Sequence, residues 1–354
     1  MKRIFNIIAV ITAILATSCI KDDYTKEYNN DFKTNYEAFW NYINENYGYL
    51  GESYGYSKNV DWHSVYEEMM PQAENAATEA ELLEIMGKSI DYLKDGHVWL
   101  DTKFKHRGCF TFYIDDNGER YPDNFIKGVI EEKYLDEAFR TRNGHRYGMI
   151  TRDNKTFFYL HHDDFIKDIN NEDLEMFQPL IAKADGIIYD IRTNPGGSAQ
   201  LSLGIAQKFV KEKTLVGYHI VKNSKEYNDF SEPSPLYISP SDADAERNWA
   251  DKKTMVLTNR DVYSAANMFA AFMKEAPNVT LVGGKTGGGG GLPCTYYLPN
   301  GWAVTMSAQR FTLDVDKKHI EPGVEPDIYV TITEEDIENK VDSILEKAIE
   351  VLSE

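Results

Sequence analysis

The sequence is poor in cysteine and in basic side chains. Its 354 residues include three cysteines, and 57 acidic residues outnumber 38 basic ones, which gives a formal net charge of −19. This balance argues against nucleic acid or an anionic membrane surface as a partner. The sequence also lacks a cysteine–histidine metal pattern and the phosphate-loop signatures GxxxxGK[ST] and GxGxxG, so we expect neither a metal nor a cofactor. Nothing in the spacing of Cys109 and Cys294 demands a disulfide, and we interpret them as separate core residues.

The apolar run at residues 7–15 is too short to span a membrane. It follows the basic start MKRIF and precedes small residues before Cys19, an arrangement that is typical of a secretory signal. We therefore predict a signal peptide over residues 1–18 and exclude it from the fold.

Residues 15–19, LATSC, resemble the bacterial lipoprotein box. The resemblance implies that Cys19 becomes the lipidated first residue of the mature protein, with residues 19–30 as a tether. Residues 21–23, KDD, resemble the acidic export tag of surface lipoproteins in Bacteroidetes-type bacteria. Together they imply a lipid-anchored protein of the cell envelope, in the outer membrane and exposed at its surface. An ordinary signal peptide that contains a cysteine, followed by a solvated tether, is the alternative.

The length suits one main domain with one or two smaller appendages. Apolar and aromatic residues recur at helical spacing over residues 36–47, and further helices are expected from Asp61 and from Thr78, where Glu81 would complete a capping box. Residues 31–98 are therefore predicted to form a small N-terminal helical domain. A short β-rich segment, with a hairpin at residues 116–118, is expected over residues 99–146.

Strands and helices alternate from residue 147 to residue 332, which predicts an α/β sheet covered on both faces. A single helical tail over residues 333–354 is expected to complete the chain. The predicted strands cover residues 156–160, 186–191, 215–221, 255–257 and 280–282, the predicted helices cover 174–183, 199–209 and 265–274, and a hairpin is expected at 299–301.

Ser264 follows a predicted strand through a short turn and opens an alanine-rich helix, where the helix dipole stabilises negative charge. An ordinary helix cap is the alternative interpretation of this serine. Residues 194–197, Asn-Pro-Gly-Gly, favour a chemical role, because glycines between a strand and a helix can turn backbone N–H groups outward, as an oxyanion hole requires. We therefore predict a serine hydrolase with Ser264 as its nucleophile.

Five segments together resemble the C-terminal processing and tricorn-core serine peptidases. They are LKDGHVWL at 93–100, YDIRTNPGGS at 189–198, VYSAANMFAAFM at 262–273, VGGKTGGGGG at 282–291 and GVEPDI at 323–328. Their order and wide spacing match the family over residues 31–332. The resemblance implies a crotonase-like peptidase core sheet with covering helices and an acyl-enzyme mechanism.

The family activates its serine in two ways, and this sequence resembles the tricorn-like branch. The lysine branch places its base after the TxG turn, where residues 287–291 are all glycine and Lys285 lies before the threonine. The tricorn-like branch uses a histidine from the D-G-H segment, which corresponds to His97. A neutral imidazole accepts a seryl proton at neutral pH, whereas a lysine must first be desolvated. His319, which precedes Glu321, is the main rival.

The same resemblance implies the other roles. Glu321 would orient the histidine, and Gly197 and Ala265 would donate the oxyanion N–H groups. Two positions depart from the family pattern: Gly96 stands where tricorn has a serine in the relay, and Asn267 stands where the family often has glutamate.

We therefore predict a cell-envelope serine peptidase that acts on a peptide or protein substrate. Residues 98–146 are too few for a full PDZ domain, so tail selection of that kind is not expected. A catalytically silent ligand- or peptide-binding lipoprotein on the same fold is one alternative, although the presence of both Ser264 and His97 argues against it. An esterase-type hydrolase is another. His161 and His162, beside two aspartates, are not taken as a metal site.

Overall fold

The computed structural model describes residues 29–50, 60–109, 123–226, 229–241, 247–313 and 319–354. The chain divides into two compact units: unit 1 comprises Met1–Asn117, Ile220–Glu232 and Gly291–Arg310, and unit 2 comprises the remainder. The predicted signal peptide, Cys19 and the hairpin at 116–118 lie outside the described residues. Within the described residues, no helix has both the length and the apolar character to cross a membrane.

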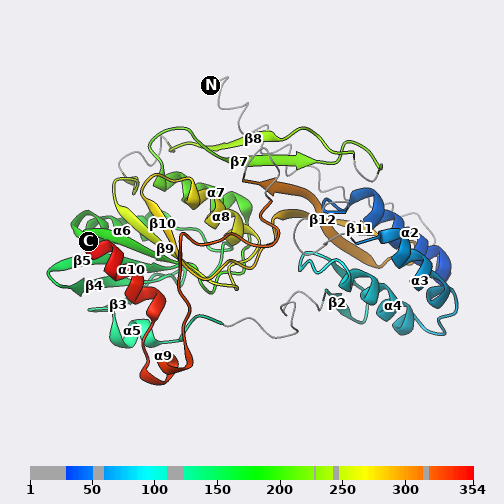
Figure 1. Ribbon diagram of the computed structural model, residues 1–354, viewed down its shortest axis with the longest axis horizontal. Coiled ribbons are helices and arrows are strands. Elements are labelled where there is room, and N and C mark those ends of the chain that lie inside the picture. The colour runs from blue at the N-terminus through cyan, green and yellow to red at the C-terminus, as the bar shows by residue number, and fades with distance from the viewer. Residues whose placement is uncertain (1–28, 51–59, 110–122, 227–228, 242–246, 314–318) are drawn as a thin grey trace. The chain divides into compact units, whose positions relative to one another are not determined.

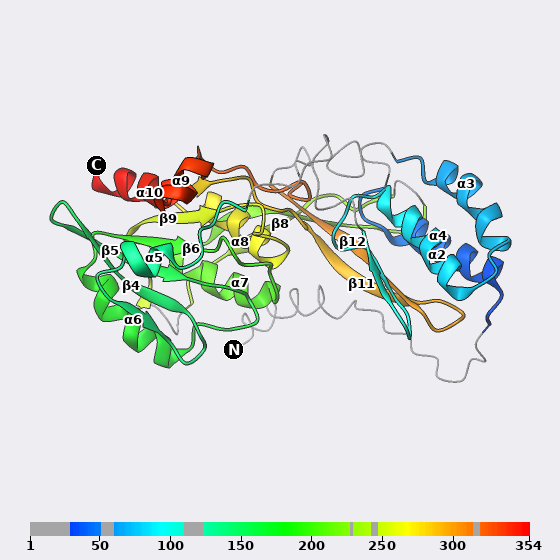
Figure 2. The ribbon, with the colours of Figure 1, turned by 90° about the horizontal axis from the view of Figure 1, so that it is seen from below.

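Unit 1 contains the three predicted helices, α2 (Phe32–Asn46), α3 (Trp62–Glu74) and α4 (Glu79–Asp91), which pack side by side (Figure 2). Asp61 caps α3 by accepting from two backbone N–H groups, as its position predicts. At α4 the predicted capping box is half formed. Thr78 accepts from the Glu81 N–H, but the Glu81 carboxylate accepts from the Ala77 N–H instead of that of Thr78.

The helices of unit 1 pack on antiparallel strands. Strand β1 (Trp99–Asp101) pairs with β2 (His106–Gly108) and with β12 (Ala303–Thr312), which also pairs with β11 (Gly291–Tyr297). The core between them is rich in aromatic side chains, and Cys109 and Cys294 are buried thiols that form no disulfide. Unit 1 thus joins the helices of residues 31–98 to strands from much later in the chain.

Unit 2 is built on a sheet that, in the described residues, has seven strands in the order β13-β10-β9-β6-β5-β4-β3. The pairs from β5 to β13 are parallel, and the β3-β4-β5 pairs are antiparallel. The strands are β3 (Ala138–Arg140), β4 (Arg146–Arg152), β5 (Lys155–His161), β6 (Gly186–Asp190), β9 (Lys253–Thr258), β10 (Val279–Gly283) and β13 (Ile328–Tyr329). The hairpin of β7 (Thr214–Val221) and β8 (Ser234–Ile238) belongs to the other sheet, where β7 pairs with β12.

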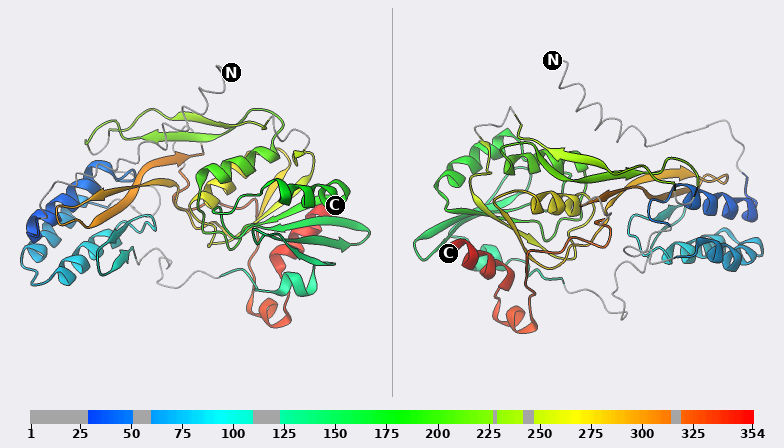
Figure 3. Two further views of the ribbon diagram at one scale, coloured as in Figure 1. Left: turned by 180° about the vertical axis from the view of Figure 1, so that it is seen from behind. Right: turned by 45° about the horizontal axis from the view of Figure 1, so that its top comes forward.

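Alternating side chains of the sheet feed two separate cores, so helices cover both faces (Figures 1 and 3). Phe158 and Leu160 point to one core, whereas Phe157 and Tyr159 point to the other. The first core is closed by α6 (Asn171–Lys183), α7 (Ala199–Ala206) with a short 3₁₀ turn (Gln207–Phe209), and α8 (Ala265–Lys274), and the second by α5 (Val129–Lys133) and α10 (Ser343–Ser353). The predicted α/β architecture is confirmed.

The predicted single tail helix is wrong in one respect, because it is broken into α9 (Glu334–Asn339) and α10. Lys340 adopts a left-handed conformation with φ of 53°, which ends α9. Asp342 then caps α10 by accepting from the Leu345 N–H at 3.0 Å.

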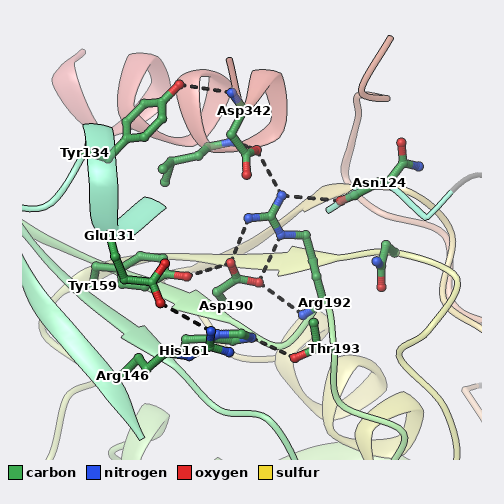
Figure 4. A network of polar contacts seen from close by, with 12 residues as sticks. Asn124, Glu131, Tyr134, Arg146, Tyr159, His161, Asp190, Arg192, Thr193 and Asp342 are labelled. Carbon is green, nitrogen blue, oxygen red and sulfur yellow. Dashed lines mark hydrogen bonds and ion pairs between the residues drawn. The ribbon is translucent and has the colours of Figure 1, made fainter. Parts of the chain in front are cut away.

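Asp342 also joins a buried ion-pair network beneath the sheet's strand ends (Figure 4). The Arg192 guanidinium lies between two carboxylates, 2.7 Å from Asp190 Oδ2 and 2.9 Å from Asp342 Oδ1, and all three side chains are fully buried. Tyr159 donates a further hydrogen bond to Asp190. Burial alone would raise the pKa of Asp190, but Arg192 outweighs it and lowers this pKa to about 2. The stabilisation is therefore present above pH 3.8 and is lost as the pH falls towards 2.

Asp342→Ala should lower the free energy of unfolding by about 3 kcal/mol, because it leaves Arg192 buried with one carboxylate fewer and removes the cap of α10. Urea denaturation measures this loss. Glu346→Ala is the control on the same helix: its ion pair with Arg152 is about 40% exposed on each side and should contribute less than about 1 kcal/mol. Equal losses in the two variants would show that the network adds no particular stability.

Candidate active site

Ser264 lies at a strained point of the backbone between β9 and α8. Its φ is 55° and its ψ is −122°, a conformation that residues other than glycine rarely adopt. Its side chain makes no cap hydrogen bond to α8, which disfavours the helix-cap alternative. Instead, its backbone is held by hydrogen bonds to Gly288 O and from the Met268 N–H, at 2.9 and 3.0 Å. A sharp strand-to-helix turn of this kind is how hydrolases present a nucleophilic serine.

The Asn-Pro-Gly-Gly turn packs directly against Ser264. A Cβ atom at Gly196 would lie 2.8 Å from the Ser264 Cβ and 2.9 Å from the Ala265 N, and the φ of Gly196 is 106°. Only glycine permits this approach. The Ala265 amide belongs to the first turn of α8, where backbone N–H groups have no partner within the helix. This places a first-turn amide of α8 against the glycine turn, as the predicted oxyanion hole requires.

The backbone N–H group of Gly197 points away from Phe165, which lies on the neighbouring extended segment. The Phe165 N–H donates to Gly196 O at 2.8 Å, and the Ser198 N–H donates to Phe165 O at 2.9 Å. Successive residues of an extended segment turn their hydrogen-bonding groups to opposite sides, so the Gly197 N–H faces away from Phe165. Gly197 is also exposed. These features are compatible with its predicted role as an oxyanion donor.

Asn194 joins the oxyanion turn to the serine turn, a role that the sequence analysis missed. Its carbonyl accepts from the Tyr263 N–H at 3.2 Å, and its Oδ1 accepts from the Gly196 N–H at 2.9 Å. Its amide nitrogen donates to His162 O at 3.1 Å, and the side chain is fully buried. An asparagine before Pro-Gly-Gly is the signal from which this could have been inferred, because its side chain readily bonds the backbone two residues on.

The glycine run at residues 287–291 packs against both the serine turn and the segment that carries Glu321. A Cβ at Gly288 would lie 2.0 Å from Glu321 O, and one at Gly289 would lie 3.0 Å from the Ser264 N. Both glycines have positive φ values, 92° and 78°. The glycine run therefore allows close backbone packing beside Ser264. It also lacks the lysine that the other family branch uses as its base.

Glu321 lies on the far side of this glycine run. Its Oε2 accepts from the Gly290 N–H at 2.7 Å, and its own N–H donates to His319 Nδ1 at 3.3 Å. The carboxyl is almost fully buried. The structure thus brings Ser264, Gly197, Ala265 and Glu321 into one region of unit 2.

Asn267, the departure from the family's frequent glutamate, fastens the segment that carries Glu321. Its amide nitrogen donates to Ile320 O at 2.9 Å, and its Oδ1 accepts from the Thr286 hydroxyl at 2.5 Å. The same hydroxyl accepts from the Val324 N–H at 2.6 Å. A neutral amide both donates and accepts here, which an ionised glutamate cannot do.

His97 belongs to unit 1, so its predicted pairing with Ser264 stays a prediction. It is buried at a turn held by Asp95, whose Oδ1 accepts from the His97 N–H at 2.7 Å. The Asp95 Oδ2 accepts from the hydroxyls of Tyr47 and Ser307, at 2.9 and 3.1 Å. Burial lowers the pKa of His97 below its ordinary value of 6.5, an effect that Asp95 partly opposes. An imidazole of this kind is neutral at neutral pH and able to accept a proton.

The two rival bases both have partners in unit 2, and His319 lies beside Glu321. Lys285 forms a half-exposed ion pair with Glu325 at 2.9 Å. His319 Nδ1 accepts from the Glu321 backbone, as described above.

The neighbouring residues His161 and His162 form hydrogen bonds that stabilise the fold. His161 Nε2 lies 2.8 Å from the Thr193 hydroxyl, and His162 bridges Tyr189 and the Lys167 carbonyl. In the part of the chain that the structure describes, no group of three or more His, Cys, Asp or Glu side chains is arranged to hold a metal ion.

Comparisons with known proteins agree with this geometry. Residues 157–330 match the model of peptidase family S41, and residues 28–90 match that of the tricorn protease C1 domain. The crystal structure of a putative peptidase from Parabacteroides merdae is 35% identical to this chain, with a TM-score of 0.80 over 92% of this chain and 97% of the other. The chain belongs to peptidase family S41. The resemblance identified from the five sequence segments is therefore confirmed.

This S41 chain is also similar to curated carboxyl-terminal-processing proteases. The protease of Synechocystis sp. is 28% identical over 144 residues, which are 41% of this chain and 30% of that protein. CtpA of Bacillus subtilis is 30% identical over 150 residues, which are 41% of this chain and 29% of that protein. The matches span less than a third of these relatives, so they support the family and not a particular substrate.

Gly196→Ala should slow the reaction of Ser264 with a fluorophosphonate by at least about 100-fold, the usual effect of losing an oxyanion donor, because the methyl group would displace Ser264 and the Ala265 amide. The labelling rate measures this. Gly204→Ala is the matched control: it lies in α7 of the same unit with no atom within 4 Å of the added Cβ. It should keep its labelling rate and gain up to about 1 kcal/mol of stability. Unchanged labelling in Gly196→Ala would contradict the close-packing argument.

Proposed function

We propose that this chain is a serine peptidase that hydrolyses peptide bonds through an acyl-enzyme. The observation that carries the proposal is the strained turn at Ser264, packed against Gly196 at the start of α8. It combines a presented hydroxyl with backbone N–H donors on rigid elements, which acyl transfer needs. Membership of peptidase family S41 supports the same activity.

In the proposed reaction the Ser264 hydroxyl attacks the carbonyl carbon of the scissile bond while the His97 imidazole takes its proton. The carbonyl oxygen becomes an oxyanion that accepts hydrogen bonds from the N–H groups of Gly197 and Ala265. Collapse of this intermediate breaks the C–N bond, and the imidazolium returns the proton to the leaving amine. A water molecule, deprotonated by the same imidazole, then hydrolyses the ester to release the carboxylic acid and restore Ser264.

Glu321 is proposed to orient the imidazole and to stabilise its charged form. Its fixed position supports this role, because the Gly290 N–H holds one carboxylate oxygen at 2.7 Å. Asp95 is proposed to set the turn that carries His97, since three hydrogen bonds hold its buried carboxylate.

Ser264→Ala should abolish hydrolysis of a mixed peptide pool while keeping the circular dichroism spectrum and the midpoint of thermal unfolding, because the lost hydroxyl does not cap α8. A fluorophosphonate should label the wild type, and peptide mapping should place the label on Ser264. Ser234→Ala, which removes an exposed hydroxyl on β8, should behave as the wild type. Unlabelled, inactive wild-type protein would instead favour a ligand- or peptide-binding lipoprotein on the same fold.

His97→Ala should lower kcat by about 10²- to 10⁴-fold, the usual contribution of a general base, whereas Lys285→Ala should have little effect. Because burial lowers the pKa of His97 below 6.5, the neutral, active form persists as the pH falls. The wild-type kcat/KM should therefore stay level down to pH 6.5 and decline only below it. A loss confined to Lys285→Ala, or to a His319 variant, would assign the base to that residue instead.

We further propose that Cys19 anchors the protein to the cell envelope, in the outer membrane with the chain exposed at the surface. The support is the LATSC segment after a short apolar run and the KDD segment behind it. Cells fed labelled palmitate should incorporate it into the wild type and into a Cys109→Ala control, but not into Cys19→Ala. Label that persists in Cys19→Ala would refute the anchor, and protease treatment of intact cells tests the surface location.

A further inference from the structure

Asn267 is a fully buried polar residue of α8, three positions after Ser264. Its side chain contacts two other segments of unit 2. Its amide nitrogen donates to Ile320 O at 2.9 Å, and its Oδ1 accepts from the Thr286 hydroxyl at 2.5 Å. Thr286 directly precedes the glycine run, and Ile320 directly precedes Glu321. One side chain therefore links the helix that begins after the serine to the glycine run and to the Glu321 segment.

The partners of Asn267 determine which of its atoms donates and which accepts. Ile320 O is a carbonyl oxygen that can only accept, and the Gly323 N–H also donates to it, at 3.0 Å. The Thr286 hydroxyl lies 2.5 Å from Asn267 Oδ1 but 3.5 Å from Val324 O, so its single proton goes to the asparagine. The hydroxyl oxygen in turn accepts from the Val324 N–H at 2.6 Å. The site at residue 267 therefore requires a side chain with one donor and one acceptor.

The backbones of the two contacted segments also approach each other closely. A Cβ at Gly323 would lie 2.2 Å from Thr286 O, and the φ of this glycine is 99°. The Thr286 N–H donates to Val324 O at 3.1 Å. The segment around Glu321 is therefore fastened to the start of the glycine run, and the Asn267 side chain fastens both to α8.

We propose that Asn267 and Thr286 are positioning residues, which keep the Glu321 carboxylate in its place relative to Ser264. The inference rests on the proposed peptidase function and adds two buried residues that support its acid. Both act through Glu321, which is proposed to orient the imidazole that activates the serine. A small displacement of such a group weakens stabilisation of the transition state and leaves substrate binding intact. Loss of either residue should therefore lower kcat without raising KM.

Thr286→Val tests this link, because it removes the hydroxyl and keeps the branched shape of the side chain. With a peptide that the wild type cleaves, its kcat should fall about 10- to 100-fold, the size expected for a small displacement of a catalytic group. KM should not change, and the rate of labelling of Ser264 by a fluorophosphonate should fall with kcat. Thr286→Ser keeps the hydroxyl and should recover most of the loss, which a role of the methyl group in packing would not predict.

Thr254→Val is the matched control. It removes another fully buried threonine hydroxyl of unit 2, one that donates to Lys252 O at 3.1 Å. Thr254 lies at the start of β9, whereas the serine turn follows the end of this strand. The control should keep the wild-type kcat and labelling rate, and circular dichroism should show each variant folded.

Asn267→Asp makes the donor at this position depend on pH. A protonated carboxyl can donate to Ile320 O, as the asparagine does, whereas an ionised carboxylate cannot. The labelling rate of the variant, divided by that of the wild type at the same pH, should be near one at about pH 5, because burial favours the protonated form. The ratio should fall about tenfold or more at about pH 8, where the carboxyl is ionised. The titratable residues that flank the partners of Asn267 are also present in the wild type, so the ratio removes their effect; they are Lys285, His319, Glu321 and Glu325.

The outcomes separate this proposal from the proposed function. Wild-type kcat and labelling in Thr286→Val, or an equal loss in Thr254→Val, would overturn the positioning role alone. If Thr286→Val does not fold, the pH dependence of Asn267→Asp decides, and a ratio that stays constant between the two pH values would overturn the role. A wild type that is labelled but cleaves no peptide would overturn the peptidase function, while the labelling rates still test the link. A wild type that is not labelled would overturn both.

Discussion

The candidate site depends on backbone segments that pass one another without side chains between them. The oxyanion turn reaches the serine turn only because residue 196 is glycine, and the 287–291 run reaches both the serine turn and the Glu321 segment for the same reason. Each added methyl group would enter the space of a neighbouring backbone atom, at distances of 2.0 to 3.0 Å. Close packing of this kind fixes the amides in place before any substrate arrives, which is the condition for electrostatic stabilisation of an oxyanion.

A buried ion-pair network forms a second constraint on the oxyanion turn. Arg192 is two residues before the Asn-Pro-Gly-Gly turn, and it lies between Asp190 at the end of β6 and Asp342 at the start of α10 (Figure 4). Three fully buried charges are tolerated because each is paired and hydrogen-bonded. The network couples the C-terminal helix, more than a hundred residues away in sequence, to the strand end that leads into the oxyanion turn.

The two positions that depart from the family pattern, Asn267 and Gly96, lie in segments that polar side chains hold in place. Asn267 uses its neutral amide to bind the Thr286 hydroxyl and the Ile320 carbonyl at once, and thereby holds the segment that leads into Glu321. The Asp95 carboxylate, ahead of Gly96, holds the turn that carries His97 through three hydrogen bonds. Polar contacts therefore support both the segment that carries Glu321 and the turn that carries His97.

The sequence by itself determined the elements and the family. Apolar periodicity and cap residues placed α2, α3, α4 and α8 closely, and five spaced segments identified the peptidase family, because both signals are local. The break at Lys340 escaped this reasoning, since an apolar stripe continues through the left-handed residue that interrupts the helix. The contact of Gly196 with Ser264 and the link made by Asn194 were decided only by tertiary structure. Each depends on which distant segments meet, and spacing along the chain does not encode that.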